Sequence, residues 1–326
     1  MERVSKKRKV SDLKDGDRVD DVFFVKFKKG FSPYSKGFSF ELTLSDSSGR
    51  SIEYKYWGNQ DEGSVRGLYD SIKPDSIVHV QGKVALYRER LQMTTGAPDK
   101  IEVLKPGQYD ESDFVKQARK DLDEMYAKLL GFVSEVKDPK LRGLLEKVFK
   151  DKEVENKFKR HPGAIDIHHN WVGGLMEHVL EVAEYCMKSK ELYPQLDKDL
   201  LIAGALLHDI GKLEELEVTS RIKGTRRGQL AGHLVLSAVF VANKCDDAGL
   251  GAETKDKLLH MIVSHHGKSE YGAPKEPMFP EALAVYYADE MSARLAEMLE
   301  FIEELKGATE DDFMYSKRHE RNILLR

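Results

Sequence analysis

The stretch Ala205-Leu-Leu-His-Asp-Ile-Gly-Lys212 constrains this chain more than any other part of it. Its apolar residues are typical of a buried helix, yet the run ends in two adjacent metal-liganding side chains, His208 and Asp209. An imidazole beside a carboxylate suits a hard or borderline divalent cation. Because such a dipeptide is common by chance, the prediction of a metal site depends on the other histidines.

Further ligand candidates lie at the polar ends of other apolar segments. His178 and His233 each stand at the start of a segment with helical spacing, His265 and His266 close another, and Asp289 follows a fourth. A helical bundle can direct side chains from separate helices inward at one level, which is how such folds build metal sites. The alternative, a set of structural core histidines, requires a separate buried partner for each ring.

Composition predicts a two-domain protein without a membrane span. The chain has 326 residues, of which 40% are hydrophobic and 33% charged, and its net charge of −4 excludes no class of partner. Cys186 and Cys245 stand far apart in helical patterns, which predicts buried free thiols in a reducing compartment. There is neither an apolar run of the ~20 residues that span a bilayer nor a signal-peptide pattern, so we expect a cytoplasmic protein.

Residues 11–105 predict an all-β barrel. Five short runs rich in β-branched and aromatic residues follow one another, at 22–28, 38–44, 51–57, 77–84 and 91–95, with a helical stretch at 65–72 between the third and fourth. This order predicts an OB-fold. Residues 1–10 form a basic segment that we expect to be mainly solvated, and the Pro-Gly pair at 106–107 marks the end of the barrel.

The rest of the chain predicts an all-α domain. Residues 106–150 show helical spacing typical of a connector that packs on a bundle, and residues 151–326 carry the histidine-rich segments.

The barrel carries residue types that hold single-stranded nucleic acid. Such barrels combine aromatic rings that stack on bases with cations that follow the phosphates. The candidates are Tyr34, Lys36, Lys55, Trp57, Arg88 and Arg90. Phe40, Tyr54 and Tyr56 are better explained as the filling of a small barrel. OB-folds also bind sugars and proteins, so the fold alone does not identify the ligand.

Four motifs stand in one order along the chain and together carry a resemblance. They are His-His-Asn-x-x-Gly-Gly-Leu-x-Glu-His at 168–178, Leu-Leu-His-Asp-Ile-Gly-Lys at 206–212, Gly-x-Leu-x-Gly-His at 228–233 and Ser-His-His-Gly at 264–267. The order of ligands resembles the HD-domain superfamily of metal-dependent phosphohydrolases. Behind an OB-fold, the combination resembles the YhaM family of 3′-to-5′ exoribonucleases. The resemblance implies metal-dependent removal of nucleotides from the 3′ end of single-stranded RNA, with DNA as a further substrate.

The predicted centre holds two divalent ions. His178, His208, Asp209 and Asp289 would hold one ion, and Asp209, as a bridge, would hold a second together with His233, His265 and His266. Two ions about 3.5 to 4 Å apart clamp the oxygens of an in-line phosphoryl displacement. We favour Mn²⁺, with Mg²⁺, Fe, Zn²⁺ or Co as alternatives. His266 is the weakest member, because neighbouring residues on a helix point about 100° apart.

Other residues are candidates for catalysis and substrate contact. Asp209 and Lys212 are predicted to be catalytic, with Lys212 neutralising a phosphate oxygen. His168 and His169 would contact a phosphate or assist the leaving group, and capping or packing is the alternative for either. Arg226 and Arg227 would guide a phosphate backbone, unless they are ordinary exposed arginines. Three nearby carboxylates read as solvated surface, namely Glu214, Glu215 and Glu217.

The sequence thus predicts a metal-dependent 3′-to-5′ exonuclease acting on single-stranded RNA or DNA. The alternative enzyme is an HD-domain phosphohydrolase that acts on nucleotides and uses the barrel for regulation. A third hypothesis, a nucleic-acid-binding protein with a structural metal, fits less well, because structural sites are closed and need no pair of ions. A homo-oligomer is compatible with all three.

Overall fold

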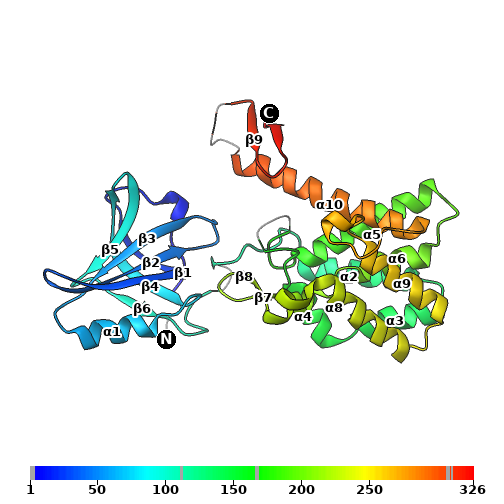
Figure 1. Cartoon of the computed structure of the whole chain (residues 1–326), viewed down its shortest axis with the longest axis horizontal. Helices are drawn as coiled ribbons and strands as arrows, with labels where there is room; N and C mark the ends of the chain where they lie inside the picture. Colours follow the sequence, from blue (N-terminus) through cyan, green and yellow to red (C-terminus); the bar gives the residue numbers. More distant parts are fainter. Residues whose placement is uncertain (1–3, 111–112, 166–168, 306–308, 310) are drawn as a thin grey trace. The chain divides into compact units, whose positions relative to one another are not determined.

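The computed structural model describes residues 4–110, 113–165, 169–305, 309 and 311–326. The chain forms two compact units, one made of Met1–Lys116 with Thr219–Arg221 and the other of Gln117–Val218 with Ile222–Arg326. Figure 1 labels their helices and strands.

The first unit is a closed barrel. Its strands are β1 (Arg18–Tyr34), β2 (Gly37–Ser45), β3 (Ser51–Trp57), β4 (Ile77–Tyr87) and β5 (Arg90–Gly96), joined by the edge strand β6 (Ile101–Val103). They pair in the order β1-β2-β3-β5-β4, and an additional pairing of β1 with β4 closes the barrel. The β3–β5 pairing is parallel and the others are antiparallel. With helix α1 (Glu62–Ser71) between β3 and β4, this is an OB-fold, as predicted.

Apolar side chains at alternate positions of the strands fill the barrel. In β3, Ile52 and Tyr54 are buried, whereas Lys55 and Trp57 point to the other face, because successive side chains of a strand point to opposite sides. The predicted core role of Phe40 and Tyr54 is confirmed, since both are fully buried with Met93.

The first strand is longer than the sequence suggests. β1 continues to Tyr34, beyond the predicted run 22–28, so Tyr34 belongs to a strand and Lys36 lies in the turn that follows. Register shifts against β2 between Val25 and Phe27 and between Lys28 and Phe31 explain the error. Such bulges bend a strand and break its alternation, which hides it from pattern analysis.

The expectation of a solvated basic terminus is wrong for Lys6, whereas Lys7 and Lys9 are exposed as expected. The Lys6 side chain is only 7% exposed, and its Nζ lies 3.3 Å from Asp46 Oδ2 and 3.7 Å from Asp21 Oδ2. Val10 is also buried. Residues 4–10 are therefore part of the barrel unit.

The barrel unit also extends past the predicted boundary near residue 105. Leu104 and Phe114 are buried in one cluster with Val22, Phe24 and Ile77. The break falls after Lys116 for this reason, and the segment 106–116, predicted as helical connector, packs with the barrel instead.

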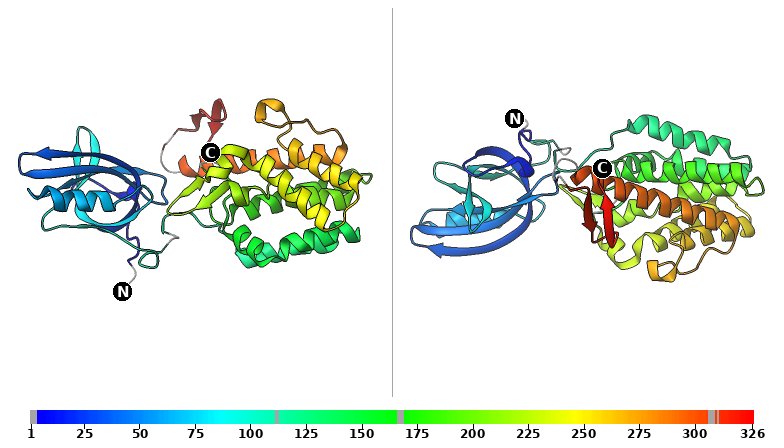
Figure 2. Two further views of the ribbon diagram at one scale, coloured as in Figure 1. Left: turned by 60° about the horizontal axis from the view of Figure 1, so that its bottom comes forward. Right: turned by 90° about the horizontal axis from the view of Figure 1, so that it is seen from above.

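The second unit is a helical bundle. Its helices are α2 (Leu122–Glu135), α3 (Pro139–Phe149), α4 (Lys152–Arg160), α5 (Gly174–Leu192), α6 (Lys198–Leu207), α7 (Lys212–Glu215), α8 (Arg226–Asp247), α9 (Ala252–Ser264) and α10 (Pro280–Leu305). Two short hairpins accompany them, β7 (Leu216–Val218) with β8 (Ile222–Gly224) and β9 (Phe313–Ser316) with β10 (Arg321–Leu324). Figure 2 shows two further views of the bundle.

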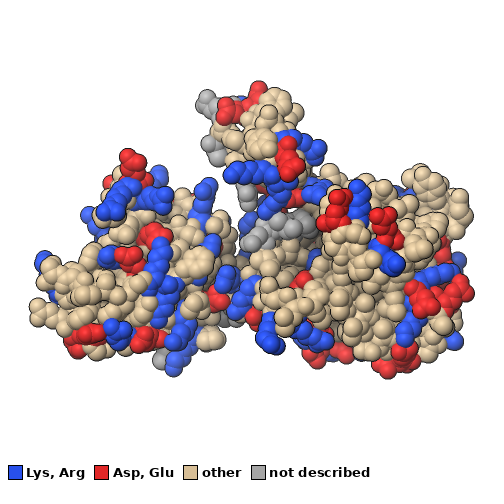
Figure 3. All heavy atoms as spheres, viewed as in Figure 1, with Lys and Arg blue, Asp and Glu red and all other residues tan. Residues whose placement is uncertain are grey.

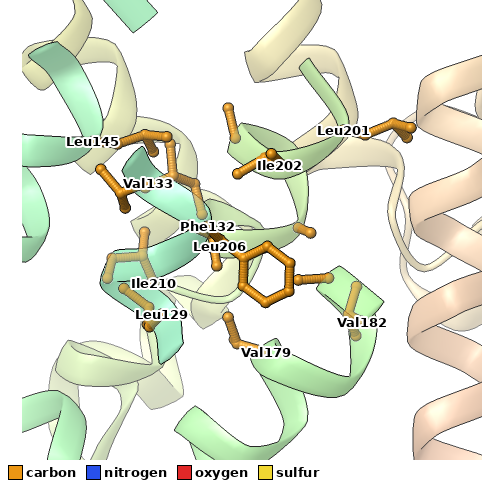
Figure 4. Close-up of a cluster of buried hydrophobic side chains, with 14 of the residues drawn as sticks. Leu129, Phe132, Val133, Leu145, Val179, Val182, Leu201, Ile202, Leu206 and Ile210 are labelled. Carbon is orange, nitrogen blue, oxygen red and sulfur yellow. The ribbon is translucent and has the colours of Figure 1, made fainter. Parts of the chain in front are cut away.

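One core joins the predicted connector to the rest of the bundle. Leu129 and Phe132 of α2 are buried with Val179 and Val182 of α5 and Leu206 of α6, as Figure 4 shows. Both cysteines are free and buried, as predicted. Within the described part of the chain, the helices lack a stretch that is both apolar enough and long enough to cross a bilayer.

Candidate metal centre

Separate helices deliver the ligand candidates to one place. His178 lies in the first turns of α5, His208 is the residue that ends α6, and His265 ends α9 in the same way. His233 lies on α8 and Asp289 on α10. All the predicted ligands therefore come from the bundle, at points where helices begin, end or cross.

One carboxylate oxygen of Asp209 faces the first ligand group. Asp209 Oδ2 lies 3.5 Å from Nε2 of His178 and 3.5 Å from Nε2 of His208. These three residues offer ligand atoms within 4.8 Å of one another. Asp289 adds a second carboxylate, with its Oδ1 3.1 Å from His178 Nε2.

The other oxygen of Asp209 faces the second group. Asp209 Oδ1 lies 3.6 Å from His233 Nε2 and 3.5 Å from His265 Nε2. His233, His265 and His266 again offer ligand atoms within 4.8 Å of one another. Asp209 thus stands between the two groups, in the position predicted for a bridging ligand.

His266 reaches this group because the helix ends before it. α9 stops at Ser264, and Gly267 has a φ of 77°, so the chain turns immediately after the two histidines. The rings of His265 and His266 lie 4.5 Å apart, and His266 Nε2 is 3.2 Å from His233 Nε2. The 100° separation expected on a continuous helix does not apply here.

Hydrogen bonds fix which ring nitrogen faces the centre. Nδ1 of His208 donates to the Ala205 carbonyl at 2.8 Å, and Nδ1 of His265 donates to the Ile262 carbonyl at 2.7 Å. A carbonyl oxygen can only accept, so the neutral ring carries its proton on Nδ1 and presents an unprotonated Nε2. This arrangement is typical of metal-binding histidines.

The same argument holds for the second group. Nδ1 of His266 donates to the Tyr271 carbonyl at 3.1 Å, and Nδ1 of His233 donates to the Glu215 carboxylate. With Nδ1 as the donor in each ring, the two Nε2 atoms, which are the positions a metal ion would take, lie 3.2 Å apart. A metal ion bound by both Nε2 atoms would hold them at such a separation.

Unsatisfied buried atoms also fit a cation. Among the described residues, Asp209 Oδ1 and His265 Nε2 are buried polar atoms without a hydrogen-bond partner. Buried polar groups are nearly always paired, so each such atom calls for an explanation. A divalent ion bound by both atoms supplies one, and the nitrogen and oxygen donor set suits Mn²⁺, Fe²⁺ or Zn²⁺.

Burial and neighbouring charge keep His208, His266 and Asp209 in their metal-binding protonation states. Burial lowers the pKa of His208 to about 3, and burial with the nearby His265 lowers the pKa of His266 to about 4. Burial alone raises the pKa of Asp209, but the neighbouring charge of Lys212 outweighs it and holds that pKa well below its usual range. Near neutral pH, His208 and His266 are therefore uncharged and Asp209 is ionised.

A close approach of two helices explains the glycine after Asp209. A Cβ at Gly211 would lie 2.5 Å from the His233 carbonyl oxygen and 2.5 Å from the Ser237 amide nitrogen. The Gly211 amide instead donates to Ser237 Oγ at 2.8 Å. The glycine thus lets the segment that carries Asp209 lie against the helix that carries His233.

A backbone break in α8 positions His233. Gly232 has φ 71° and ψ 156°, values outside the helical region that favour glycine. The His233 amide donates to Glu215 Oε1 at 3.0 Å, and the His233 ring is held by the same carboxylate. Glu215, which the sequence suggested was solvated surface, is therefore the residue that orients a ligand.

We expect Glu215→Ala to weaken metal binding by about 10- to 100-fold, the usual effect of removing a group that orients a metal-binding histidine. Glu214→Ala is the matched control, because Glu214 is the preceding residue and pairs with Arg227 on the surface. Chelator competition with both variants measures the effect. Equal loss in the two variants would contradict this role.

Lys212 is tied to the centre, not exposed. Its Nζ lies 2.7 Å from Asp209 Oδ2, and its side chain is only 13% exposed. The predicted contact with a substrate phosphate therefore requires this ion pair to loosen or to be shared.

His169 borders the first ligand group. Glu181 and Ser292, which the sequence did not single out, lie there as well. His169 is buried, and its Nε2 lies 3.3 Å from Glu181 Oε2. The same oxygen accepts from Ser292 Oγ at 2.8 Å, and Ser292 Oγ lies 3.0 Å from His178 Nδ1. Glu181 stands one helical turn after His178, so its i+3 spacing was the available signal. His168 lies outside the described residues.

The structure brings three of the nucleic-acid candidates together on the barrel. The Tyr34 and Trp57 rings lie 4.8 Å apart, and Lys55 Nζ lies 4.5 Å from the Trp57 ring centre. Trp57 is 36% exposed, whereas Lys55 Nζ also pairs with Glu41 at 2.8 Å. Lys36 is exposed in the adjoining turn.

Arg88 and Arg90 lie apart from that group, at the turn between β4 and β5. Together with Tyr87 they line a cavity of about 330 Å³. On the face shown in Figure 3, basic side chains are spread over the barrel among acidic ones and do not form one stripe. In the bundle, Arg226 and Arg227 are exposed at the start of α8, and Arg227 pairs with Glu214.

Comparison with known proteins relates this chain to a family. The HD domain family matches residues 175–294. Along 296 residues the chain is 33% identical to the 3′-5′ exoribonuclease YhaM of Bacillus subtilis (strain 168), covering 89% of this chain and 90% of that protein.

Similarity to solved structures is distant. The OB domain of Ta0387 from Thermoplasma acidophilum has a TM-score of 0.23 and 15% identity, over 30% of this chain and 86% of that one. A Replication Protein A heterotrimer bound to ssDNA has a TM-score of 0.27 and 17% identity, over 37% of this chain and 29% of that one. The extent and level of identity with YhaM are decisive, and the chain belongs to the YhaM family of OB-fold and HD-domain proteins.

Proposed function

We propose that this protein is a metal-dependent 3′-to-5′ exonuclease that hydrolyses single-stranded RNA. The observation that carries the proposal is Asp209, whose two carboxylate oxygens face separate pairs of histidines at 3.5 to 3.6 Å. Membership of the YhaM family supports the activity and the RNA substrate.

The residues of the centre would hold two divalent ions. His178, His208 and Asp289 would hold one, His233, His265 and His266 the other, and Asp209 both. When bound, such a pair stabilises the attacking and leaving oxygens of an in-line displacement at phosphorus. We favour Mn²⁺, with Mg²⁺, Fe, Zn²⁺ or Co as alternatives.

The chain's own groups would position the substrate around this centre. Lys212, held on Asp209, supplies a positive charge beside the phosphoryl oxygens. His169, held by Glu181, borders His178 with their rings 5.3 Å apart and can face the leaving group. We assign substrate guidance to Arg226 and Arg227 at the start of α8.

A time course on end-labelled substrates tests the proposal. With Mn²⁺, we expect 5′-labelled single-stranded RNA to shorten stepwise from its 3′ end while nucleoside triphosphates stay intact. Single-stranded DNA run in parallel measures the preference between the two polymers. Hydrolysis of nucleotides without shortening of RNA would favour the alternative, an HD-domain nucleotide phosphohydrolase.

The barrel would hold the strand by stacking and by charge. Trp57→Ala should cost roughly 1 to 3 kcal/mol of single-strand affinity with little dependence on base identity, because every base presents a π-face. Titration of a labelled oligonucleotide without metal measures this cost. Lys55→Ala is the companion variant, and it should instead flatten the salt dependence of binding. Unchanged affinity with a lower melting temperature in Trp57→Ala would place Trp57 in the barrel core.

A further inference from the structure

The outward side of α10 is apolar. Between residues 283 and 299 of this helix, six side chains are exposed and five of them are large and apolar. The exposed fractions are 44% for Leu283, 58% for Tyr287, 48% for Met291, 47% for Leu295 and 64% for Leu299. A surface helix normally places charged and polar residues there. We call these five residues the α10 stripe.

Packing on the other side fixes the direction of the stripe. Val285, Ala288 and Ser292 are buried against the bundle, and Asp289 points into the metal centre. Rotating α10 about its own axis to bury the stripe would move Asp289 out of the metal centre. Figures 1 and 2 show α10 on the outside of the bundle. The stripe is therefore left for a partner.

The spacing of the stripe is self-complementary. Its residues recur every fourth position, which forms one i±4n ridge, and ridges of this kind interdigitate between helices. Met291 is the central member. If two copies of α10 cross antiparallel about a two-fold axis at Met291, Tyr287 meets Leu295 of the second copy and Leu283 meets Leu299. We propose that the α10 stripe is the contact between two copies of this chain.

Charge and size favour a second copy over nucleic acid. Between residues 283 and 299 the most exposed charged side chains are Arg294 and Glu290, which lie 2.8 Å apart. Arg294 also lies 3.6 Å from Glu297, so it offers little to a phosphate. In the two-fold arrangement Arg294 of one copy faces Ala288 of the other, so the two copies of Arg294 do not meet. The stripe covers 16 helical steps, about 24 Å. Closed two-fold dimers use one such patch on both subunits.

Sedimentation of the full-length protein tests the association. We expect a mass about twice the 37.1 kDa of the chain at micromolar concentration. Leu295→Glu should weaken association at least about tenfold by placing a charge in the contact. Leu86→Glu is the control, since Leu86 is 59% exposed on β4 of the barrel unit and is not part of the stripe. A monomeric wild-type protein at about 100 µM would overturn the proposal.

Cross-linking tests the two-fold axis itself. Met291→Cys should form a covalent dimer with a short bis-maleimide, whereas Leu283→Cys alone should not, because its neighbour in the second copy is Leu299. The double variant Leu283→Cys, Leu299→Cys should cross-link. The native Cys186 and Cys245 are buried and do not interfere. The proposal fails if Met291→Cys stays monomeric in the reagent, as it would if the barrel of the same chain covers the stripe.

Discussion

Asp209→Ala should reduce RNA hydrolysis by roughly three orders of magnitude or more, because one carboxylate serves both ligand groups and its loss disrupts both ions. Bound metal should fall together with activity, since Asp209 Oδ1 and Oδ2 each face two histidine nitrogens at 3.5 to 3.6 Å. Elemental analysis after removal of free ions, with a time course on labelled RNA, measures both quantities.

The helical fold should survive this change. Leu206 and Ile210 on either side of Asp209 are buried in the main core and hold the segment in place. Asp246→Ala is a suitable control, because that carboxylate is exposed and pairs with Lys255 away from the centre. Circular dichroism should show the same helix content in both variants. Full activity in Asp209→Ala would end the two-ion hypothesis.

Removal of the barrel should have the second largest effect. A protein that begins at Gln117 should lose about 100-fold in kcat/KM on long RNA, which corresponds to one or two lost stacking contacts, but little on a dinucleotide. The cut belongs after Lys116 and not after residue 105. Phe114 packs with the barrel, so the earlier cut would leave this apolar side chain exposed on the helical part.

The comparison of the two substrates separates the two enzyme hypotheses. Equal losses on RNA and on the dinucleotide, or undiminished activity on RNA, would show that the barrel does not deliver a strand and would favour the nucleotide phosphohydrolase. Bound metal, measured in the same preparation, shows whether the shortened protein keeps its centre. Trp57→Ala in the full chain is the companion variant, because it leaves the rest of the barrel in place.

Local sequence was enough for most of the barrel strands and for bringing most of the ligand candidates into view. The β3 alternation places Ile52 and Tyr54 inside the barrel without any tertiary information, because the period of a strand is fixed by its pleat. In the same way, the apolar run before His208 can only be a buried helix, and its polar end must face a site inside the bundle. The four-motif order then related the chain to its family.

Local sequence did not predict contacts between segments that are distant along the chain. Glu215 looked like one of several surface carboxylates, and only the break at Gly232 brings the His233 amide and ring onto it. Lys6 looked like part of a solvated terminus, and only the folded barrel surrounds it with Asp21 and Asp46. The periodicity of a sequence cannot predict such contacts, because the path of the folded chain decides which distant residues become neighbours.

Sequence alone therefore determined the two-part architecture, the residue types of the centre and the central place of Asp209. The tertiary structure decided how those residues divide: one oxygen of Asp209 faces His178 and His208, the other faces His233 and His265. It also decided that His266 joins the second group and that the stripe on α10 stays exposed. The physical reason is that a ligand type is a property of one side chain, whereas a shared site depends on where separate helices end and cross.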